Sequence, residues 1–262
     1  MDIRLDGRVA LITGGSAGLG LAMATQFAQS GARVGILARR ADVLEHARAG
    51  IVAKTGVSDA VVAISCDVRD AAQLSAAHKA VVTALGPVDI LVNNAGTSAA
   101  GPFLNHGADA WQADFDLKLF SAVRLIGLVL PAMIERGWGR IINVLNTAAK
   151  AAPAGSLPTA ATRAGGLALT KALAGEMAKH NILVNALCTG LLVSEQWERR
   201  YDANPGDGSF DDFVNRMGKG IPIGRMGDAA EFANMACFLA SDAASYITGT
   251  AINIDGGLSP VV

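Results

Sequence analysis

The stretch that decides the fold is Thr13-Gly14-Gly15-Ser16-Ala17-Gly18-Leu19-Gly20, which follows an apolar, β-branched run and precedes an amphipathic helical segment. Glycines at a turn from strand to helix let the backbone come close to a pyrophosphate, whose charge is met by amide groups at the helix N-terminus. The glycine spacing is GxxxGxG rather than GxGxxG, and glycine-rich turns also occur for purely structural reasons. The turn therefore indicates a nucleotide site only together with the rest of the chain.

Short apolar runs alternate with longer helical segments along the whole chain. Strict alternation of strand and helix predicts a parallel sheet covered by helices on both faces. The near-continuous hydrophobicity of the runs is typical of strands buried on both sides. We therefore expect an α/β fold, a single doubly wound Rossmann domain with a parallel seven-stranded sheet. The expected strands are Val9–Thr13, Val34–Leu37, Val61–Ser65, Ile90–Asn93, Arg140–Val144, Leu183–Leu187 and Ala251–Ile254, and the expected helices are Leu19–Gln29, Ala41–Ala53, Ala71–Ala84, Ala108–Arg136, Thr159–Lys179 and Asp228–Ala240.

The connection Thr189–Gly227 breaks this alternation. It is richer in charge, glycine and proline, and it contains two pieces that fit short helices, Glu195–Tyr201 and Phe210–Met217. A long excursion inside a compact domain is usually a lid or a binding loop. We expect it to be the substrate loop of one domain that spans residues 1–262.

The composition of the 262 residues excludes several classes of protein. Apolar residues make up 51% and charged residues 17%, which is too apolar for a disordered chain. The net charge of −1 gives no basic field for nucleic acid, and no run reaches the roughly eighteen apolar residues that a membrane span needs. The three cysteines form no CxxC pair, no cluster has metal-ligand spacing, and the N-terminus lacks a secretory pattern. We expect a cytoplasmic protein without a metal and without a nucleic-acid or membrane partner.

Two arginines follow the second expected strand, where a site selective for NAD usually places an acid for the ribose 2′-hydroxyl. Arg39 and Arg40 stand there instead, and a guanidinium can bind a 2′-phosphate through two hydrogen bonds. Arginines are also common at solvated helix starts. We expect NADP as the cofactor, in preference to NAD.

Four motifs in order along the chain give a more specific indication. They are the glycine turn, Asp67-Val68 after the third strand, Asn93-Asn94-Ala95-Gly96 after the fourth, and the closing Ile254-Asp255-Gly256-Gly257. Together they resemble the short-chain dehydrogenase/reductase family, and the general pattern is similar to its β-ketoacyl reductase-like members. The resemblance covers essentially the whole chain.

The resemblance implies roles for residues around a nicotinamide cofactor. Asp67 would bind the adenine amino group, the Asn94–Gly96 turn would line the cofactor ribose, and the backbone of Leu192 with the hydroxyl of Ser194 would contact the nicotinamide. It also implies a homo-oligomer, a dimer or tetramer built through the helices Ala108–Arg136 and Thr159–Lys179. The full expected cofactor set is Gly14, Ser16, Gly18, Leu19, Gly20, Arg39, Arg40, Asp67, Val68, Asn94, Ala95, Gly96, Arg163, Leu192 and Ser194.

The family's usual Asn-Ser-Tyr-Lys catalytic set is not present at the matching positions. The register of Gly139-Arg140-Ile141-Ile142-Asn143-Val144 places Asn146 at the serine position, Thr159 at the tyrosine position and Arg163 at the lysine position. Lys118 stands at the asparagine position of the earlier helix. All four positions differ, and these four residues are the candidate catalytic set.

These exchanges alter the chemistry that the site can perform. Threonine is a far weaker acid than tyrosine, and arginine stays protonated, so Arg163 can hold a ribose but cannot relay protons. Asn146 can donate a hydrogen bond to a carbonyl. If Arg163 lies near Lys118, its charge lowers the pKa of the lysine, which makes Lys118 a general acid or a nucleophilic amine. Alternatively the two cations bind an anionic substrate, or Lys118 points to solvent or pairs with Asp114 one helical turn earlier.

Three functions remain open at this point. The leading hypothesis is an NADP-dependent oxidoreductase that transfers hydride to a small carbonyl or enone substrate without the usual Ser-Tyr-Lys set. The second is a non-redox enzyme of lyase or isomerase type that uses Lys118, Asn146 and Arg163. The third is a catalytically inactive NADP-binding protein, because a fold alone does not fix a function.

Overall fold

The computed structural model describes residues 3–203 and 208–262 and contains one seven-stranded sheet. All six neighbouring strand pairs are parallel, and the strand order is β3-β2-β1-β4-β5-β6-β7. The predicted fold is therefore confirmed. The strands are β1 (Val9–Thr13), β2 (Arg33–Ala38), β3 (Val61–Ser65), β4 (Ile90–Asn93), β5 (Gly139–Asn146), β6 (Ile182–Thr189) and β7 (Ala251–Ile254).

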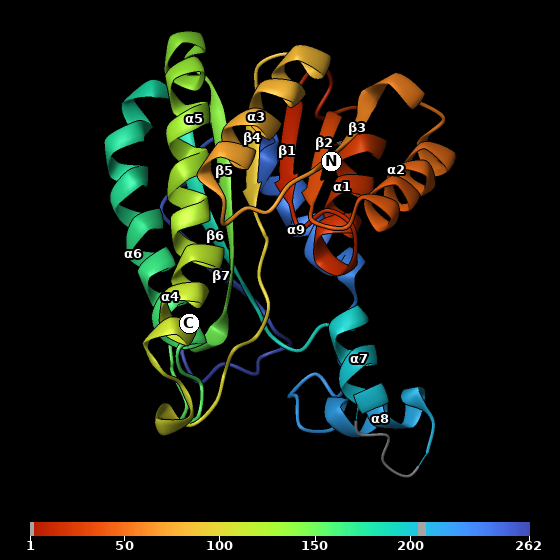
Figure 1. Cartoon of the computed structure of the whole chain (residues 1–262), viewed down its shortest axis with the longest axis vertical. Coiled ribbons are helices and arrows are strands. Elements are labelled where there is room, and N and C mark those ends of the chain that lie inside the picture. Colours follow the sequence, from red (N-terminus) through yellow and green to blue (C-terminus); the bar gives the residue numbers. More distant parts are fainter. Residues whose placement is uncertain (1–2, 204–207) are drawn as a thin grey trace.

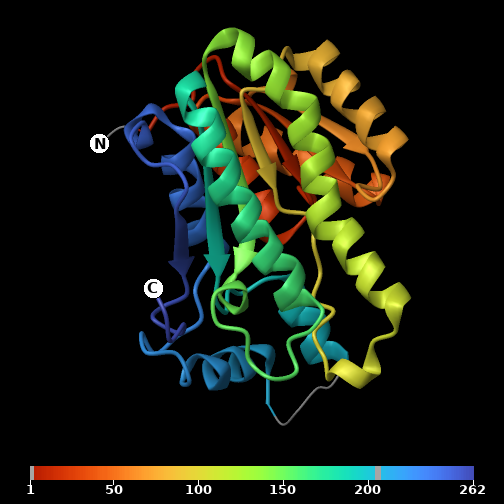
Figure 2. The ribbon, with the colours of Figure 1, turned by 90° about the vertical axis from the view of Figure 1, so that its left-hand side faces the viewer.

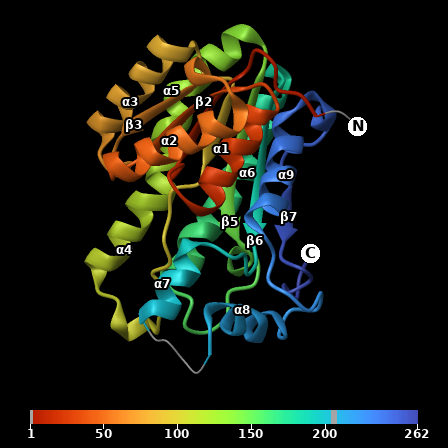
Figure 3. The same cartoon turned by 90° about the vertical axis from the view of Figure 1, so that its right-hand side faces the viewer.

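Helices cover both faces of the sheet. One apolar cluster joins the sheet to α1, α2 and α9, which lie in front of it in Figure 3. A second cluster joins the opposite face to α3, α5 and α6, and Figure 2 shows α5 and α6 crossing that face. The helices are α1 (Gly18–Gln29), α2 (Ala41–Thr55), α3 (Ala71–Leu85), α4 (Ala108–Phe115), α5 (Ser121–Arg136), α6 (Thr159–Met177), α7 (Glu195–Ala203), α8 (Phe210–Gly218) and α9 (Ala229–Ala240).

The strand order reverses between β1 and β4, at the carboxyl edge of the sheet. In open α/β sheets the crevice at such a switch point is where ligands bind. The expected short helices of the connection 189–227 are present as α7 and α8, and both lie beyond this edge (Figure 1). The fold thus brings the glycine turn after β1, the turn after β4 and the long connection to one end of the molecule.

The expected helix Ala108–Arg136 is continuous but not uniform. Between α4 and α5 the chain forms a π-helical turn, η3 (Asp116–Phe120), after which the amide of Ser121 bonds the carbonyl oxygen of Asp116. Such wide turns inside α-helices often mark functional sites. This turn carries Lys118, and local hydrophobic periodicity gives no sign of it.

The same helix corrects the expectation that no segment is apolar enough to span a membrane. By length and composition Ala108–Arg136 passes that test, with a mean hydropathy of 1.9 over its most apolar window. The expectation failed because an average over a window tolerates scattered polar residues, whereas an unbroken run does not. In the fold the helix is a cover of the sheet: Leu125, Val129 and Met133 are buried in the cluster shared with α3.

Candidate functional site

The glycine turn between β1 and α1 is a tight backbone cradle. Gly14 and Gly18 have φ of +66° and +53°, values that residues with a side chain rarely adopt. A Cβ on Gly20 would lie 2.1 Å from the carbonyl oxygen of Gly14, so the helix start and the turn approach too closely for any larger residue. Ala17 precedes the helix without a side-chain cap, and Ser16 and Leu19 flank it half-buried. The first amides of α1 are therefore left for an anion.

The arginines and the acid expected to bind the adenosine end lie after β2 and β3. Arg39 is exposed, and Arg40 Nη2 lies 3.8 Å from Glu195 Oε1 on α7. The carboxylate of Asp67 accepts hydrogen bonds from the guanidinium of Arg69, which lowers the pKa of Asp67 with a smaller contribution from Arg39. Asp67 is thus tied to Arg69, a partner that the sequence reasoning did not consider. Its neighbour Val68 is buried.

The Asn94–Gly96 turn is fixed to the end of β1. Asn94 Nδ2 donates to the carbonyl oxygen of Thr13 across 2.9 Å, and the amides of Asn94 and Ala95 both donate to Thr13 Oγ1. A Cβ on Gly96 would lie 3.3 Å from Arg163 Nη2 and 3.6 Å from Lys118 Cγ. Gly96, the last residue of this turn, therefore faces Arg163 and Lys118.

The structure brings two of the four candidate catalytic residues into direct contact. Lys118, in η3, donates from Nζ to Oγ1 of Thr159, the first residue of α6, across 2.9 Å. The same Oγ1 accepts the amide of Ala99 across 3.0 Å. Two helices far apart in the sequence thus meet at one hydroxyl.

Lys118 is buried and paired. Its side chain is 5% exposed and forms an ion pair with Asp114, whose own side chain is 2% exposed. Thr162 Oγ1 donates to the other carboxylate oxygen of Asp114 across 2.8 Å. The solvent-exposed alternative is therefore wrong, and the alternative that pairs Lys118 with Asp114 is confirmed.

The environment of Lys118 lowers its pKa from 10.5 to about 8. Burial is the largest cause, because it penalises the charged ammonium, and the Asp114 carboxylate opposes it. The charge of Arg163 adds a smaller lowering effect. The direction agrees with the expectation from the sequence, whereas the expected cause, Arg163, is secondary.

Arg163 and Asn146 each carry an unsatisfied polar atom. Arg163 Nη1 donates to the carbonyl oxygen of Val144 across 2.8 Å, and burial lowers the pKa of its guanidinium. Arg163 Nε and Asn146 Oδ1 are buried and have no hydrogen-bond partner among residues 3–203 and 208–262. Since buried polar groups are normally paired, these two atoms are candidates for contact with a bound ligand.

The segment expected to contact the nicotinamide lies beside the glycine turn. A Cβ on Gly18 would lie 3.6 Å from Cβ of Ser194. Leu192 is buried and bridges to Gly227, and the amide of Val193 donates to the Gly227 carbonyl oxygen across 2.8 Å. The first residues of the long connection are therefore fixed rather than free.

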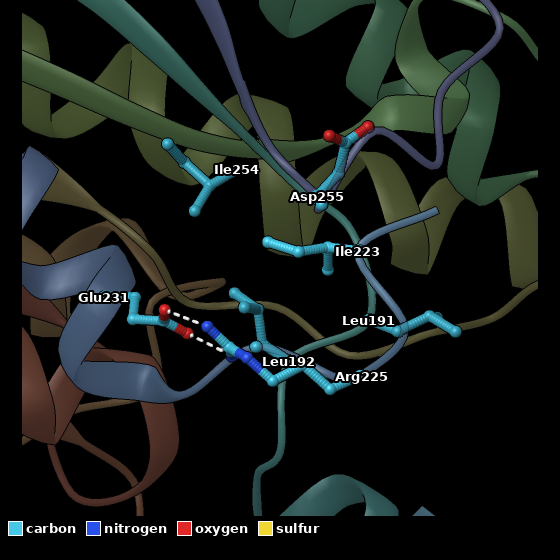
Figure 4. A pocket seen from close by; sticks show the side chains of 9 residues that line it. Leu191, Leu192, Ile223, Arg225, Glu231, Ile254 and Asp255 are labelled. Atoms are coloured by element: carbon cyan, nitrogen blue, oxygen red, sulfur yellow. Dashed lines mark hydrogen bonds and ion pairs between the residues drawn. The ribbon is translucent and has the colours of Figure 1, made fainter. Parts of the chain in front are cut away.

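Leu191 and Leu192 of this segment also line a small cavity of about 100 Å³. Figure 4 shows Leu191, Leu192 and Ile254 around it, with the two hydrogen bonds between Arg225 and Glu231 closing one side. None of the four candidate catalytic residues lines it. The cavity shares only Leu192 with the expected cofactor set.

Three groups around Lys118 and Thr159 were not predicted as site residues from the sequence: Asp114, which was considered only as an alternative partner of Lys118, Thr162 and the amide of Ala99. Asp114 had a signal, because it stands four residues before Lys118 in a helix. Thr162 is visible only as a polar residue three positions after Thr159 on the same helix. The amide of Ala99 had no signal, since its position depends on how the loop after β4 folds against α6.

The comparisons with known proteins identify the family. The profile of a family described as Enoyl-(Acyl carrier protein) reductase matches residues 14–259. The chain belongs to the short-chain dehydrogenase/reductase family. A family relative, the Oxidoreductase UcpA of Escherichia coli (strain K12), is 38% identical over 97% of this chain and 95% of its own length.

Solved structures of the family superpose along the whole chain. L-sorbose reductase from Gluconobacter frateurii, complexed with NADPH and L-sorbose, has a TM-score of 0.94 at 33% identity, covering 100% of both chains. An NADPH-bound short-chain oxidoreductase from Pseudomonas aeruginosa PAO1, described as containing an atypical catalytic center, has a TM-score of 0.91 at 34% identity, covering 99% of both chains. The chain is thus an oxidoreductase of the short-chain dehydrogenase/reductase type.

Proposed function

We propose that this protein is an NADPH-dependent reductase that transfers hydride to a small carbonyl or enone substrate with an atypical catalytic set. The observation that carries the proposal is the contact between Lys118 Nζ and Thr159 Oγ1, next to Gly96 and the cofactor turn. Reduction of a carbonyl needs a proton for the developing alkoxide, and a positioned donor contributes roughly 10²–10⁴ in rate. A lysine with a pKa of about 8 is such a donor near neutral pH.

The residues of the cofactor cleft fit NADP. The uncapped start of α1 suits the pyrophosphate, and the exposed Arg39 with its neighbour Arg40 suits a 2′-phosphate. The unsatisfied Nε of Arg163 suits a polar atom of the nicotinamide ribose. When bound, NADPH supplies the hydride, while the protein supplies orientation and electrostatics. Two structurally similar relatives are NADPH complexes, which supports the same cofactor here.

Each candidate catalytic residue then has a role of its own. Lys118 is the source of the proton. Asn146 stands at the end of β5, where its amide donates to the substrate oxygen, and Arg163 fixes the cofactor ribose while bonded to Val144. Thr159 holds the Lys118 ammonium through its hydroxyl oxygen, and we assign it to the substrate side of that contact.

The two alternative functions are less well supported. A nucleophilic amine must reach a substrate, but the Lys118 side chain is 5% exposed and its Nζ already contacts Asp114 and Thr159. The ion pair with Asp114 also balances the charge that an anion-binding pocket would need. A protein that only binds NADP would not require a buried lysine with a lowered pKa, such as Lys118, at this edge of the sheet.

We propose that the connection 189–227 is the substrate loop and that the protein is cytoplasmic.

We also propose that the protein is a homo-oligomer. The outer side of η3 and α5 exposes Phe120, Val123 and Ile134 to 40%, 45% and 38%. Exposed apolar side chains aligned on one helix are typical of a subunit interface. Size-exclusion chromatography of the protein and of Val123→Glu tests this; an unchanged elution volume would contradict an interface there.

The function is tested by following the loss of reduced-nicotinamide absorbance with a panel of small aldehydes, ketones and enones. We expect oxidation of NADPH with at least one class of substrate, and weaker activity with NADH. Absence of saturable NADPH binding at millimolar concentration would contradict the proposal, and so would tight binding without turnover across the panel.

A further inference from the structure

Thr159 Oγ1 has both of its acceptor positions occupied. A hydroxyl oxygen accepts two hydrogen bonds and donates one. The amide of Ala99 and Nζ of Lys118 fill the two acceptor positions at 3.0 Å and 2.9 Å. In the described part of the chain no acceptor receives the Thr159 O–H. This hydroxyl can therefore only donate, and its donor direction is left for a group that enters the site.

Lys118 is held in place by Asp114 while its Nζ donates a hydrogen bond to the Thr159 hydroxyl oxygen. Thr162 Oγ1 donates to Asp114 Oδ2, and Asp114 Oδ1 accepts from Lys118 Nζ. Asp114 on α4 and Arg163 on α6 are the charged groups that act on the ammonium. Because Asp114, Thr162 and Thr159 are each less than 5% exposed, the arrangement is shielded from water.

We propose that Thr162, Asp114, Lys118 and Thr159 form one hydrogen-bonded chain that delivers a proton to the substrate oxygen through the Thr159 hydroxyl. The inference rests on the proposed reductase function and assigns the atom that touches the substrate. Thr159 is then the catalytic residue that contacts the substrate, while Asp114 and Thr162 are positioning residues. A threonine too weak to act as an acid alone works here because its oxygen regains a proton from Lys118.

The proton movements balance in one step. The reduced nicotinamide of NADPH, when bound, would give up hydride to the carbonyl carbon and become oxidised, and the electron pair of the C=O bond moves to the oxygen. The Thr159 O–H bond breaks as a new O–H bond forms on the substrate oxygen. One N–H bond of Lys118 breaks as a new bond forms to Thr159 Oγ1, which leaves the hydroxyl unchanged and Lys118 as a neutral amine. When the product leaves, the Thr159 hydroxyl faces the vacated site, and a proton from water that enters there returns to Lys118 through Thr159 Oγ1 before the next turnover.

The activity test compares three variants of Thr159 and Lys118 in the full-length protein. Thr159→Val keeps the shape and removes the hydroxyl, so we expect kcat to fall by roughly 10²–10⁴ with an unchanged Kd for NADPH. Thr159→Ser keeps the hydroxyl and should stay within about tenfold of the wild type. Lys118→Met should lose as much as Thr159→Val. If Lys118→Met leaves Asp114 unpaired and the protein unfolds, the double variant Lys118→Met/Asp114→Asn replaces it.

Thr170→Val is the matched control. Thr170 is a buried threonine on the same helix, and its hydroxyl bonds Asn143 and the carbonyl oxygen of Gly166 instead of Lys118. We expect it to keep the wild-type kcat. The solvent isotope effect on kcat should be as large in Thr159→Ser as in the control and should disappear in Thr159→Val. This result would mark the hydroxyl as part of the proton path.

A second readout does not depend on turnover. In protein labelled with carbon-13 at the lysine ε-carbon, the Lys118 resonance should titrate with a pKa of about 8. Thr159→Val should lower this pKa, because the lost hydrogen bond stabilised the ammonium. An unchanged pKa together with an unchanged kcat in Thr159→Val overturns the relay. If Lys118→Met abolishes reduction but Thr159→Val does not, the proposed reductase function stands and proton delivery through Thr159 is wrong. If the wild type oxidises no NADPH, both proposals are wrong.

Discussion

Lys118 Nζ and Thr159 Oγ1 are joined by a hydrogen bond of 2.9 Å across 41 positions of sequence. The bond connects the π-helical turn of one long helix to the first residue of another. Both residues belong to the candidate catalytic set that the sequence motifs predict, and the structure shows that they are in contact. This contact brings an ammonium and a hydroxyl together next to Gly96, in the turn after β4.

The rate of reduction should depend on pH through Lys118. The pKa of this lysine is lowered to about 8, and only the protonated form can supply a proton. We therefore expect kcat to fall above pH 8, by about tenfold per pH unit. A pH profile of NADPH oxidation checks this, and a kcat that stays level between pH 7 and about 10 would contradict it.

Asp114→Asn should shift the fall of kcat with rising pH toward lower pH. The carboxylate of Asp114 favours the charged form of Lys118, so its neutral replacement lowers the pKa of the lysine further. The same pH profile measured on the variant tests this. Asp116→Asn is the matched control, because Asp116 lies on the same helix and faces Arg124 rather than Lys118.

The pKa of Lys118 also affects stability. In the unfolded chain the lysine holds its proton up to about pH 10.5, whereas in the folded protein it releases the proton at about 8. Between these values the unfolded state binds more protons, so this group increases the free energy of unfolding as the pH rises. Urea unfolding of the protein and of Lys118→Met/Asp114→Asn should show this gain in the wild type only.

Asn146 should matter through its amide. If it donates to the substrate oxygen, Asn146→Ala removes a hydrogen bond that strengthens in the transition state and lowers kcat by roughly 10²–10³. Asn146→Ser keeps a hydrogen-bond donor at this position and should keep more of the activity. Equal activity of the two variants would show that Asn146 is not a donor.

The two arginines after β2 should distinguish NADPH from NADH. A charge-assisted hydrogen bond contributes about 1.5–3 kcal/mol, so Arg39→Ala/Arg40→Ala should weaken NADPH binding by roughly 10–100-fold or more. NADH binding should change little. Arg33→Ala, at the opposite end of β2, is the control. Equal losses for both cofactors would contradict a 2′-phosphate site.

Gly20→Ala should damage both the turn and the cofactor site. The new methyl group would lie 2.1 Å from the carbonyl oxygen of Gly14, a contact that forces the backbone to move. Gly50→Ala on α2 is the control, since a Cβ there meets nothing within 4 Å and should stabilise the helix by about 0.5–1 kcal/mol. Thermal unfolding and NADPH titration distinguish the two variants.

The sequence predicted the sheet because its strands are apolar, short and separated by helices. All seven strands and the two short helices of the connection 189–227 are where the pattern placed them, with shifts of one or two residues at the ends. β5 and β6 run further than expected because their pairing continues to Asn146 and Thr189. The π-helical turn was not predicted, because Asp116–Phe120 is shorter than the window over which hydrophobic periodicity is read.

The sequence predicted which residues belong to the candidate site, but not which of them are in contact. Motif register placed Lys118 and Thr159 at corresponding family positions, yet it could not show that they touch, because that depends on how η3 packs against α6. The burial of Asp114 was also out of reach, since its charge suggests a surface residue. The effect of Arg163 on Lys118 was overestimated because sequence reasoning cannot compare it with the cost of burial.

The most direct test of the account is single-turnover oxidation of NADPH by a responsive carbonyl substrate, measured with the wild type and with Thr159→Val. We predict that Thr159→Val binds NADPH with the wild-type Kd and oxidises it roughly 10²–10⁴ times more slowly. Oxidation at the wild-type rate by the variant would contradict proton delivery through this hydroxyl.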